Sequence, residues 1–554
     1  MTPQTLAQLL DTLRESPARV VFPGTGEVLP HRDIPGRAAA AARLLTELGV
    51  GAPDVVGLLV PASVSWLPSY FGVALTGAAV AALPLPPVVL DPIAAARQLS
   101  AVVDAAGIRH IVASGSGLAV GRELAHLRTG IVIIDAGNSS GGGAPPPSLP
   151  DLDPDAPAAV QFSSGSTARP KGVLLTHRAL LAGVDAINTH IRTVADDVLV
   201  QWVPLFHDMG TVALLCSLLA PCDAHLFSPT AFIRDPAVVL SHIADVGGSI
   251  VTGPNFSYDA FVRAAGKAFG DDPGPDRLAR WRLALNGSES VKADTVRAFT
   301  DTFTPLGAAP TTMYPCYGMA EATLAITLPE LGTAPRVVIV DRRALTPGER
   351  VRQVSATTAE GRELVGLGVP VPQMRVRVCG ADGNPFPDGT LGEIHINGPA
   401  VTTGYLNDDP NTRQALVNGW LRTGDLGFFD HGELFVAGRL KEMIVVHGRN
   451  YFAEDVEQAV CGVPGIYKGN CVAIADPHEE RIVVVAEVAK FADAGVRERV
   501  ASDILAAAGA AGGPARVRVV TIPPRGLPRT TSGKWQRSLV AKLITDIWRE
   551  HNHV

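Results

Sequence analysis

Four hydroxyl residues and a glycine follow one another without interruption in the first third of the chain. The run consists of Ser163, Ser164, Gly165, Ser166 and Thr167, and Pro170, Lys171 and Gly172 close it. Backbone N–H groups and hydroxyls in a loop that leaves a strand suit polyphosphate oxygens, and a lysine adds a mobile positive charge. The spacing differs from G-x-x-x-x-G-K-[ST], so a Walker A loop is excluded. A solvated Ser/Gly surface turn is the alternative.

This run resembles the phosphate-loop signature of the adenylate-forming superfamily, which comprises acyl- and aryl-CoA synthetases, peptide-synthetase adenylation domains and luciferases. Five further stretches resemble motifs of that superfamily and occur in the same order. They are Asn286-Gly287-Ser288-Glu289, Tyr317-Gly318-Met319-Ala320-Glu321-Ala322-Thr323, Leu421-Arg422-Thr423-Gly424-Asp425, Gly438-Arg439-Leu440-Lys441-Glu442 and Leu527-Pro528-Arg529-Thr530-Thr531-Ser532-Gly533-Lys534. Most of these stretches, taken singly, would be turns or charged strand edges. Their shared order identifies the chain as a member of the superfamily.

The resemblance implies a site for ATP and Mg²⁺. Tyr317 covers the purine face together with Gly318, Met319 and Ala320 of the same motif, and the loop of Asn286, Gly287 and Ser288 lies against the adenine. Glu321 offers a hard oxygen to Mg²⁺. Asp425 accepts both ribose hydroxyls, as an acceptor-only carboxylate can, and Arg439 touches ribose or phosphate.

The resemblance also implies the reaction, in which a carboxylate attacks the α-phosphate of ATP to give an acyl-adenylate and pyrophosphate. Lys534 would meet the carboxylate and the α-phosphate, where a cation offsets the repulsion between two anions. Lys171, Mg²⁺ and the loop donors would supply the remaining charge stabilisation, and no protein nucleophile is needed. No G-x-S-x-G nucleophile elbow on a turn between a strand and a helix suggests a hydrolase, and the H-E-x-x-H motif of metalloproteases is missing from the sequence.

Three stretches resemble fatty acyl-AMP ligases more than acyl-CoA synthetases. They are Val203-Pro204-Leu205-Phe206-His207-Asp208-Met209-Gly210, Thr252-Gly253-Pro254-Asn255-Phe256-Ser257-Tyr258 and Gly448-Arg449-Asn450-Tyr451-Phe452. The resemblance places Phe206, Asp208, Met209, Asn255 and Phe256 at the acyl pocket. His207 would contact the carboxylate or gate the pocket, and a buried structural histidine is the alternative.

About forty residues separate the Glu321 motif from Gly366-Leu367-Gly368. They resemble the extra segment by which these ligases restrain the C-terminal domain and obstruct chemistry with CoA; an inert surface loop is the alternative. The chain departs from the family at Phe162-Ser163, Ser288-Glu289-Ser290-Val291 and Phe452-Ala453, where Tyr-Thr, Ala-Glu-Pro-Val and Tyr-Pro are common. These departures remove no charged catalytic group, but they caution against assuming a standard long-chain substrate.

Composition limits the partners and the location. The net charge of −7 argues against nucleic acid, because phosphate binding needs a basic face. The apolar runs are broken by glycine and proline, so we expect no stable membrane insertion, and no signal peptide is visible. The six cysteines show no zinc spacing and indicate buried thiols in a reducing compartment. We therefore expect a cytoplasmic protein.

The elements that must position these residues are those of an α/β protein. Strands and helices alternate between residues 55 and 134, which favours a parallel sheet. Short strands between Asp-Gly and Asn-Gly turns follow from about 365 to 440 and indicate hairpins or a small β-barrel-like part. We predict an N-terminal adenylation domain over residues 1–439. We predict a smaller α+β domain over residues 440–554, and the resemblance implies that this domain is mobile and turns at the hinge residue Lys441.

Three functions are weighed. The favoured one is a fatty acyl-AMP ligase of the acid–thiol type, which passes the acyl group to the phosphopantetheine thiol of an acyl carrier protein in lipid, polyketide or lipopeptide biosynthesis. The second is an acyl-CoA synthetase that uses free CoA. The third is a nucleotide-binding regulatory protein without catalysis, which the retained Lys171, Glu321 and Lys534 disfavour.

Overall fold

The computed structural model describes residues 2–86, 90–139, 149–163, 170–270, 274–358, 360–476, 478–489, 494–512, 516–529 and 535–551. Within these ranges, the side chains of residues 138, 139, 163, 494, 510–512 and 548–551 are outside the description. Two predicted site stretches therefore lie wholly or partly outside the described residues: Ser163 (side chain), Ser164, Gly165, Ser166 and Thr167 in the hydroxyl run, and Lys534 near the C-terminus.

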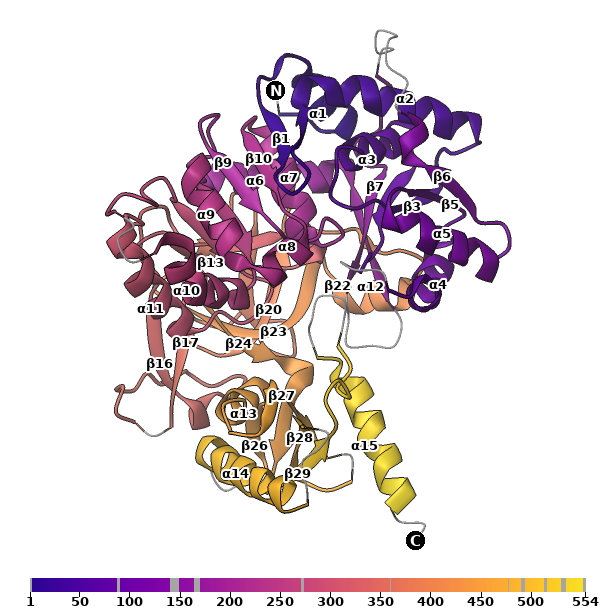
Figure 1. Ribbon diagram of the computed structural model, residues 1–554. Coiled ribbons are helices and arrows are strands. Elements are labelled where there is room, and N and C mark those ends of the chain that lie inside the picture. Colours follow the sequence, from indigo (N-terminus) through magenta and orange to yellow (C-terminus); the bar gives the residue numbers. More distant parts are fainter. Residues whose placement is uncertain are drawn as a thin grey trace.

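One seven-stranded sheet holds the strand that precedes the hydroxyl run. Its order is β21-β8-β7-β4-β3-β5-β6, with bounds Gly404–Tyr405, Lys171–Thr176, Pro157–Ser163, Ala79–Ala82, Val55–Leu59, His110–Ala113 and Val132–Asp135. Strands β7, β4, β3, β5 and β6 are parallel, and helices α3 (Trp66–Leu75), α4 (Pro92–Ala106) and α5 (Ser116–Leu127) connect or cover them. The predicted alternation of strands and helices is confirmed here (Figure 1).

A second seven-stranded sheet, ordered β13-β12-β11-β9-β10-β1-β2, lies beside the first. Its strands are Met313–Pro315, Leu283–Asn286, Ile250–Gly253, Val198–Gln201, Asp223–Leu226, Arg19–Phe22 and Glu27–Pro30. All neighbours are parallel except the edge pair β1–β2. The buried helices α6 (His177–Ile191) and α7 (Asp208–Leu219) share one hydrophobic core with both sheets, whereas Phe261 of α10 (Asn255–Phe269) and Phe299 of α11 (Ala293–Phe303) belong to a second core.

An antiparallel sheet forms the third part of the large unit. Its strands are β19 (Arg375–Cys379), β20 (Gly392–Asn397), β23 (Trp420–Asp430), β24 (Glu433–Arg439) and β22 (Leu416–Val417). Asn418 and Gly419 connect β22 to β23 with φ of 51° and 77°, the type I′ geometry that an Asn-Gly pair favours. The predicted hairpins are therefore present.

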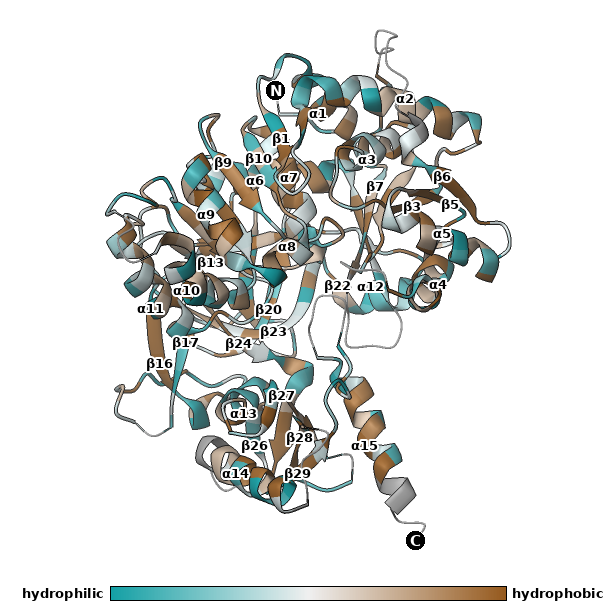
Figure 2. Ribbon diagram, in the orientation of Figure 1, coloured by the Kyte–Doolittle hydropathy of each residue, from teal (hydrophilic) through white to brown (hydrophobic). Residues whose placement is uncertain are grey.

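The last part of the chain forms a compact α+β unit beneath β24 (Figure 1). A hairpin of β25 (Met443–Val446) and β26 (Arg449–Phe452) leads to α13 (Ala453–Val460), and β27 (Ile466–Ala475), β28 (Ile482–Val488) and β29 (Val517–Ile522) form a sheet. Helices α14 (Ala494–Gly512) and α15 (Arg537–His551) complete it. Two hydrophobic cores of this unit contain only residues beyond 443, and the apolar β28 is seen in Figure 2. The division at residue 439 stays a prediction.

Some elements were not predicted from the sequence. The strands β1 and β2 near the N-terminus join the second sheet, and α15 follows the Lys534 motif. The part of the chain that the structure describes includes no helix long and apolar enough to cross a membrane. All six cysteines are free, and four of them are buried.

Candidate active site

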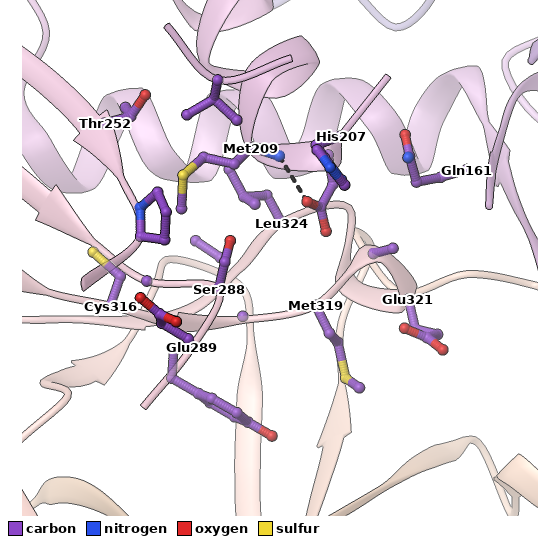
Figure 3. Close-up of a pocket in the computed structure, with 18 of the residues that line it drawn as sticks. Gln161, His207, Met209, Thr252, Ser288, Glu289, Cys316, Met319, Glu321 and Leu324 are labelled. Carbon is purple, nitrogen blue, oxygen red and sulfur yellow. Dashed lines mark hydrogen bonds between the residues drawn. The ribbon is translucent and has the colours of Figure 1, made fainter. Parts of the chain in front are cut away.

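A cavity of about 980 Å³ opens where the large unit meets the C-terminal unit. It lies at the carboxyl ends of β9, β11 and β12, the position at which ligands commonly bind parallel sheets. Figure 3 shows Thr252, Met209 and Cys316 on one side of this cavity and His207, Gln161 and Glu321 on the other. The cavity brings together fourteen of the residues that the motifs predict: Lys171, His207, Asp208, Met209, Phe256, Gly287, Ser288, Tyr317, Gly318, Met319, Ala320, Glu321, Arg439 and Lys441.

Lys171 follows the hydroxyl run and lies within the described residues. It is the first residue of β8 and pairs in register with Ser163, the last residue of β7. Its Nζ donates to Asn411 Oδ1 at 3.0 Å and lies 4.9 Å from the centre of the Tyr405 ring. Burial and the charge of Lys441 lower the pKa of Lys171, while Asp408 and Glu321 oppose the shift. Two lysines facing one cavity favour an anionic ligand between them.

Glu321 faces the same part of the cavity (Figure 3). The Tyr405 hydroxyl donates to Glu321 Oε1 at 2.9 Å, and burial raises the pKa of Glu321. Among the described residues, no group of three histidine, cysteine or acidic side chains could hold a metal ion alone. A single hard carboxylate fits Mg²⁺ nevertheless, because Mg²⁺ is usually held by one or two carboxylates and the substrate phosphates.

Asp425 links the predicted adenine and ribose motifs. Its Oδ2 accepts a hydrogen bond from the Tyr317 hydroxyl at 2.7 Å, and its Oδ1 lies 3.2 Å from Arg439 Nε. The carboxylate is buried and raises the pKa of Arg439; burial and the same carboxylate raise the pKa of Tyr317. Tyr317 and Arg439 line the cavity, whereas Asp425 stands behind them. The carboxylate therefore fixes both side chains, and a ribose would have to reach it between them.

The Asn286 loop is supported from behind by Asn255. Asn255 Oδ1 accepts from Asn286 Nδ2 at 3.2 Å and from the Lys292 backbone N–H at 3.1 Å. Asn255 Nδ2 donates to Thr295 Oγ1 at 2.9 Å. Both asparagines are buried, so the cavity is lined instead by Gly287 and Ser288, and Ser288 adopts a φ of 69°. In this geometry Asn255 supports the loop of Gly287 and Ser288 from behind, and its own side chain is not part of the cavity lining.

His207 immediately precedes α7 and faces the cavity (Figure 3). Asp208 Oδ1 accepts from the Met209 backbone N–H at 2.7 Å in the first turn of α7. Phe206 packs its ring 4.6 Å from the His207 ring, and its carbonyl accepts from Gln161 Nε2 at 2.6 Å. Phe206 thus holds β7 against the start of α7, while His207 and Met209 present their side chains to the ligand space.

The C-terminal unit supplies one wall. Lys441 and Arg529 line the cavity, and Arg529 donates to Asn470 Oδ1 at 2.6 Å and stacks 3.6 Å from the Trp535 ring centre. Arg529 precedes Lys534 by five positions in the sequence. The catalytic role assigned to Lys534 lies outside the described residues and stays a prediction.

Residues 336–365 belong to the large unit and contact the C-terminal unit. Strands β16 (Val337–Asp341) and β17 (Gly361–Val365) form an antiparallel hairpin, and Arg362 of β17 pairs with Asp455 of α13 at 2.8 Å. Both side chains are only 10% exposed, and Arg362 also lies over the Phe452 ring at 4.8 Å. Arg336 fixes the base of the hairpin through Asp430 and Glu433, at 2.7 and 2.8 Å. The segment is therefore packed against the C-terminal unit.

Sequence reasoning missed several site residues. Tyr405 and Asn411 come from β21 and α12 (Asp409–Ala415), and Gln161 comes from β7. These residue types carry no motif by themselves.

Comparison with known proteins identifies the relatives of this chain. The sequence profile of the AMP-binding enzyme family matches residues 10–406. A long-chain-fatty-acid–AMP ligase, FadD26 of Mycobacterium marinum, is 32% identical over 93% of this chain and 91% of its own length. A putative acyl-CoA synthetase of Caulobacter vibrioides is 30% identical over 92% of this chain and 89% of its own.

A medium-chain-fatty-acid–[acyl-carrier-protein] ligase, JamA of Moorena producens, is 34% identical over 70% of this chain and 68% of its own. Among solved structures, a fatty acyl-adenylate ligase from a study of the E. coli and L. pneumophila proteins superposes with a TM-score of 0.89 at 26% identity. That superposition covers 99% of this chain and 98% of the other.

Proposed function

Because the chain belongs to the AMP-binding enzyme family, we propose that it is a fatty acyl-AMP ligase. It activates a fatty acid with ATP to an acyl-adenylate and pyrophosphate, and then passes the acyl group to a carrier protein. The observation that carries this proposal is one cavity with two kinds of wall. Tyr317, Glu321 and Arg439 line its polar part, and Ile191, Leu199 and Ile250 line its apolar part. A nucleotide and an acyl chain can meet at their junction.

In the first step a carboxylate oxygen bonds to the α-phosphorus while the bond to the pyrophosphate oxygen breaks. Lys171 is fixed by Asn411 and Tyr405, so its charge is directed at a ligand that enters the cavity. Arg439, fixed by Asp425, adds a second cation. Mg²⁺ held by Glu321 would neutralise charge on the phosphates. Preorganised cations of this kind stabilise a transition state more than the separated reactants.

We assign Lys534 as the cation that meets both the carboxylate and the α-phosphate. Lys534→Ala should abolish acyl-dependent pyrophosphate release and leave ATP binding largely intact. Pyrophosphate release with a ladder of fatty acids and ATP titration by calorimetry measure the two effects. Loss of ATP binding together with unfolding of the C-terminal unit would make Lys534 structural, and unchanged pyrophosphate release would remove it from the mechanism.

In the second step the acceptor is the phosphopantetheine thiol of an acyl carrier protein. The name of JamA supports this acceptor, while the name of the Caulobacter relative supports free CoA as the second candidate. The hairpin of β16 and β17, packed on α13, favours the carrier protein if it restrains the C-terminal unit. Deleting residues 336–359 should then raise CoA-dependent thioester formation, and no change would separate the hairpin from acceptor choice.

A further inference from the structure

The apolar part of the cavity follows one face of α7. Met209, Ala213 and Ser217 are spaced four residues apart, and with Cys216 they line the cavity. Positions four apart lie on one face of a helix. Met209, Ala213 and Cys216 keep 7%, 8% and 7% exposure, whereas Leu214 and Leu215 have none. Beyond Met209 this face therefore consists of small side chains, Ala213, Cys216 and Ser217, beside the open space of the cavity.

The opposite wall runs in the same direction. Ile250 and Thr252 of β11 and Leu285 of β12 line the cavity, and Ile250 pairs in register with Leu199 of β9, which also lines it. The wall therefore extends from Pro254, just beyond the carboxyl end of β11, to Ile250, which is four positions earlier and about 13 Å away at the rise of a strand. Along α7, Ser217 lies eight positions beyond Met209, a rise of about 12 Å. β11 and α7 thus give the same depth for the apolar part of the cavity.

The deep end has a rigid floor. Cys222, which is 1% exposed, donates its backbone N–H to the Ser217 carbonyl at 3.1 Å, and both line the cavity. The third floor residue, Thr193, is held to Asn188 through its backbone N–H and its hydroxyl. Behind them Arg282 pairs with the buried Asp197 at 2.7 Å and donates to the Ile191 carbonyl at 2.9 Å. Moving this floor would break a partly buried ion pair, so it resists a longer ligand.

We propose that α7 limits the length of the acyl chain that the cavity accepts, and that the side chains of Ala213 and Ser217 determine this limit. This inference rests on the proposed function, because it takes the cavity as an acyl site with the carboxyl group at the level of His207 and Met209. A staggered alkyl chain advances about 1.3 Å per carbon, so about 12 Å accommodates about nine carbons beyond the carboxyl group. The substrate class is therefore medium-chain fatty acids, with an upper limit near ten to twelve carbons.

In the wild-type enzyme, kcat/KM for adenylation should rise steeply with acyl chain length and then stop rising at a defined length. Each additional buried methylene contributes about 0.8 kcal/mol, which corresponds to about a fourfold gain in kcat/KM for adenylation. From hexanoate to decanoate the gain should reach about two-hundredfold. Beyond about twelve carbons the gain should stop and reverse, because the floor does not move.

The experiment measures acid-dependent pyrophosphate release for even-numbered acids from four to eighteen carbons. Ala213→Phe places a ring one helical turn, about 6 Å, above the level of Ser217 and should move the limit to about six carbons. Ser217→Phe should shorten the limit by fewer carbons than Ala213→Phe. Leu505→Phe, which places the same ring at an exposed position of α14, is the matched control and should keep the wild-type limit.

Hexanoate separates a folded variant from a damaged one. In Ala213→Phe the decanoate-to-hexanoate ratio of kcat/KM should fall from about two hundred to one or less, while hexanoate is still adenylated. Ala213→Leu, a smaller obstruction, repeats the test if the phenylalanine variant does not fold. If variants that still adenylate hexanoate keep the wild-type limit on chain length, the role proposed for α7 is wrong, while the proposed function still stands. A wild-type enzyme that adenylates no acid of any length would overturn both.

Discussion

The ion pair between Arg362 and Asp455 gives a direct test of how the C-terminal unit is held. Asp455→Asn keeps the size of the side chain and removes its charge. Arg362 would then remain 90% buried without its counterion at 2.8 Å, although the Phe452 ring at 4.8 Å still covers it. Removing one partner of a buried pair costs about 3–5 kcal/mol.

We expect the lower end of that range, about 3 kcal/mol, because asparagine still offers an oxygen acceptor to the guanidinium. The cost applies only while β17 and α13 are in contact. The ratio of docked to undocked C-terminal unit should therefore fall about a hundredfold. Burial also raises the pKa of Asp455, and the charges of Arg362 and Arg342 oppose that shift in part.

Hydrogen–deuterium exchange at the amides of residues 337–341 and 361–365 measures the docked fraction. Their protection should fall in Asp455→Asn and recover in part in a double variant with Arg362→Leu, which also removes the buried guanidinium that had lost its counterion. Asp503→Asn makes the same chemical change at an exposed position of α14 and is the matched control. Equal protection in Asp455→Asn and Asp503→Asn would refute the argument that this pair holds the unit in place.

Two further predictions concern the metal and pH. Glu321→Gln should raise the Mg²⁺ concentration needed for half-maximal adenylation at least tenfold without changing thermal unfolding, because Tyr405 can still donate to the amide oxygen; an unchanged Mg²⁺ dependence would contradict this role. Burial lowers the pKa of His177 to about 4, and its Nδ1 accepts the Leu6 backbone N–H at 3.3 Å. A lowered histidine pKa contributes stability that is present above about pH 6.5 and lost as the pH falls towards 4, up to about 3 kcal/mol. His177→Gln should remove that part of the pH dependence of the free energy of unfolding, as measured by denaturant titration. His126→Gln, at an exposed histidine, is the control and should retain it. A wild-type pH dependence in His177→Gln would refute the assignment.

The sequence predicted the local elements well because their signals are local. Alternating apolar strands and helices between residues 55 and 134 needed only periodicity, and Asn418-Gly419 specified its own turn. Strand β1 was missed because it is only four residues long, too short for a clear period; it pairs with the neighbouring β2 and with β10, about two hundred residues away. Helix α15 had a readable signal in Val540 and Ile544, four residues apart and both fully buried.

Site residues that belong to sequence motifs could be predicted, whereas positions that depend on packing between distant parts of the chain could not. Tyr317, Glu321 and Arg439 line one cavity, as the motif order implied. The positions of Asn255 and Asp425 behind the lining depend on which side chains meet across strands, and no single stretch encodes that. Tyr405 reaches Glu321 only because β21 pairs with β8 across more than two hundred residues.

The measurement that tests the central claim most directly is mass spectrometry of the products. The enzyme would be mixed with ATP, Mg²⁺ and decanoate, and then with either CoA or a carrier protein bearing phosphopantetheine. The account predicts that decanoyl-adenylate accumulates, persists in the presence of CoA and is consumed when the carrier protein becomes acylated. Conversion to decanoyl-CoA would show an acyl-CoA synthetase instead, and the absence of any adenylate would contradict the proposed reaction itself.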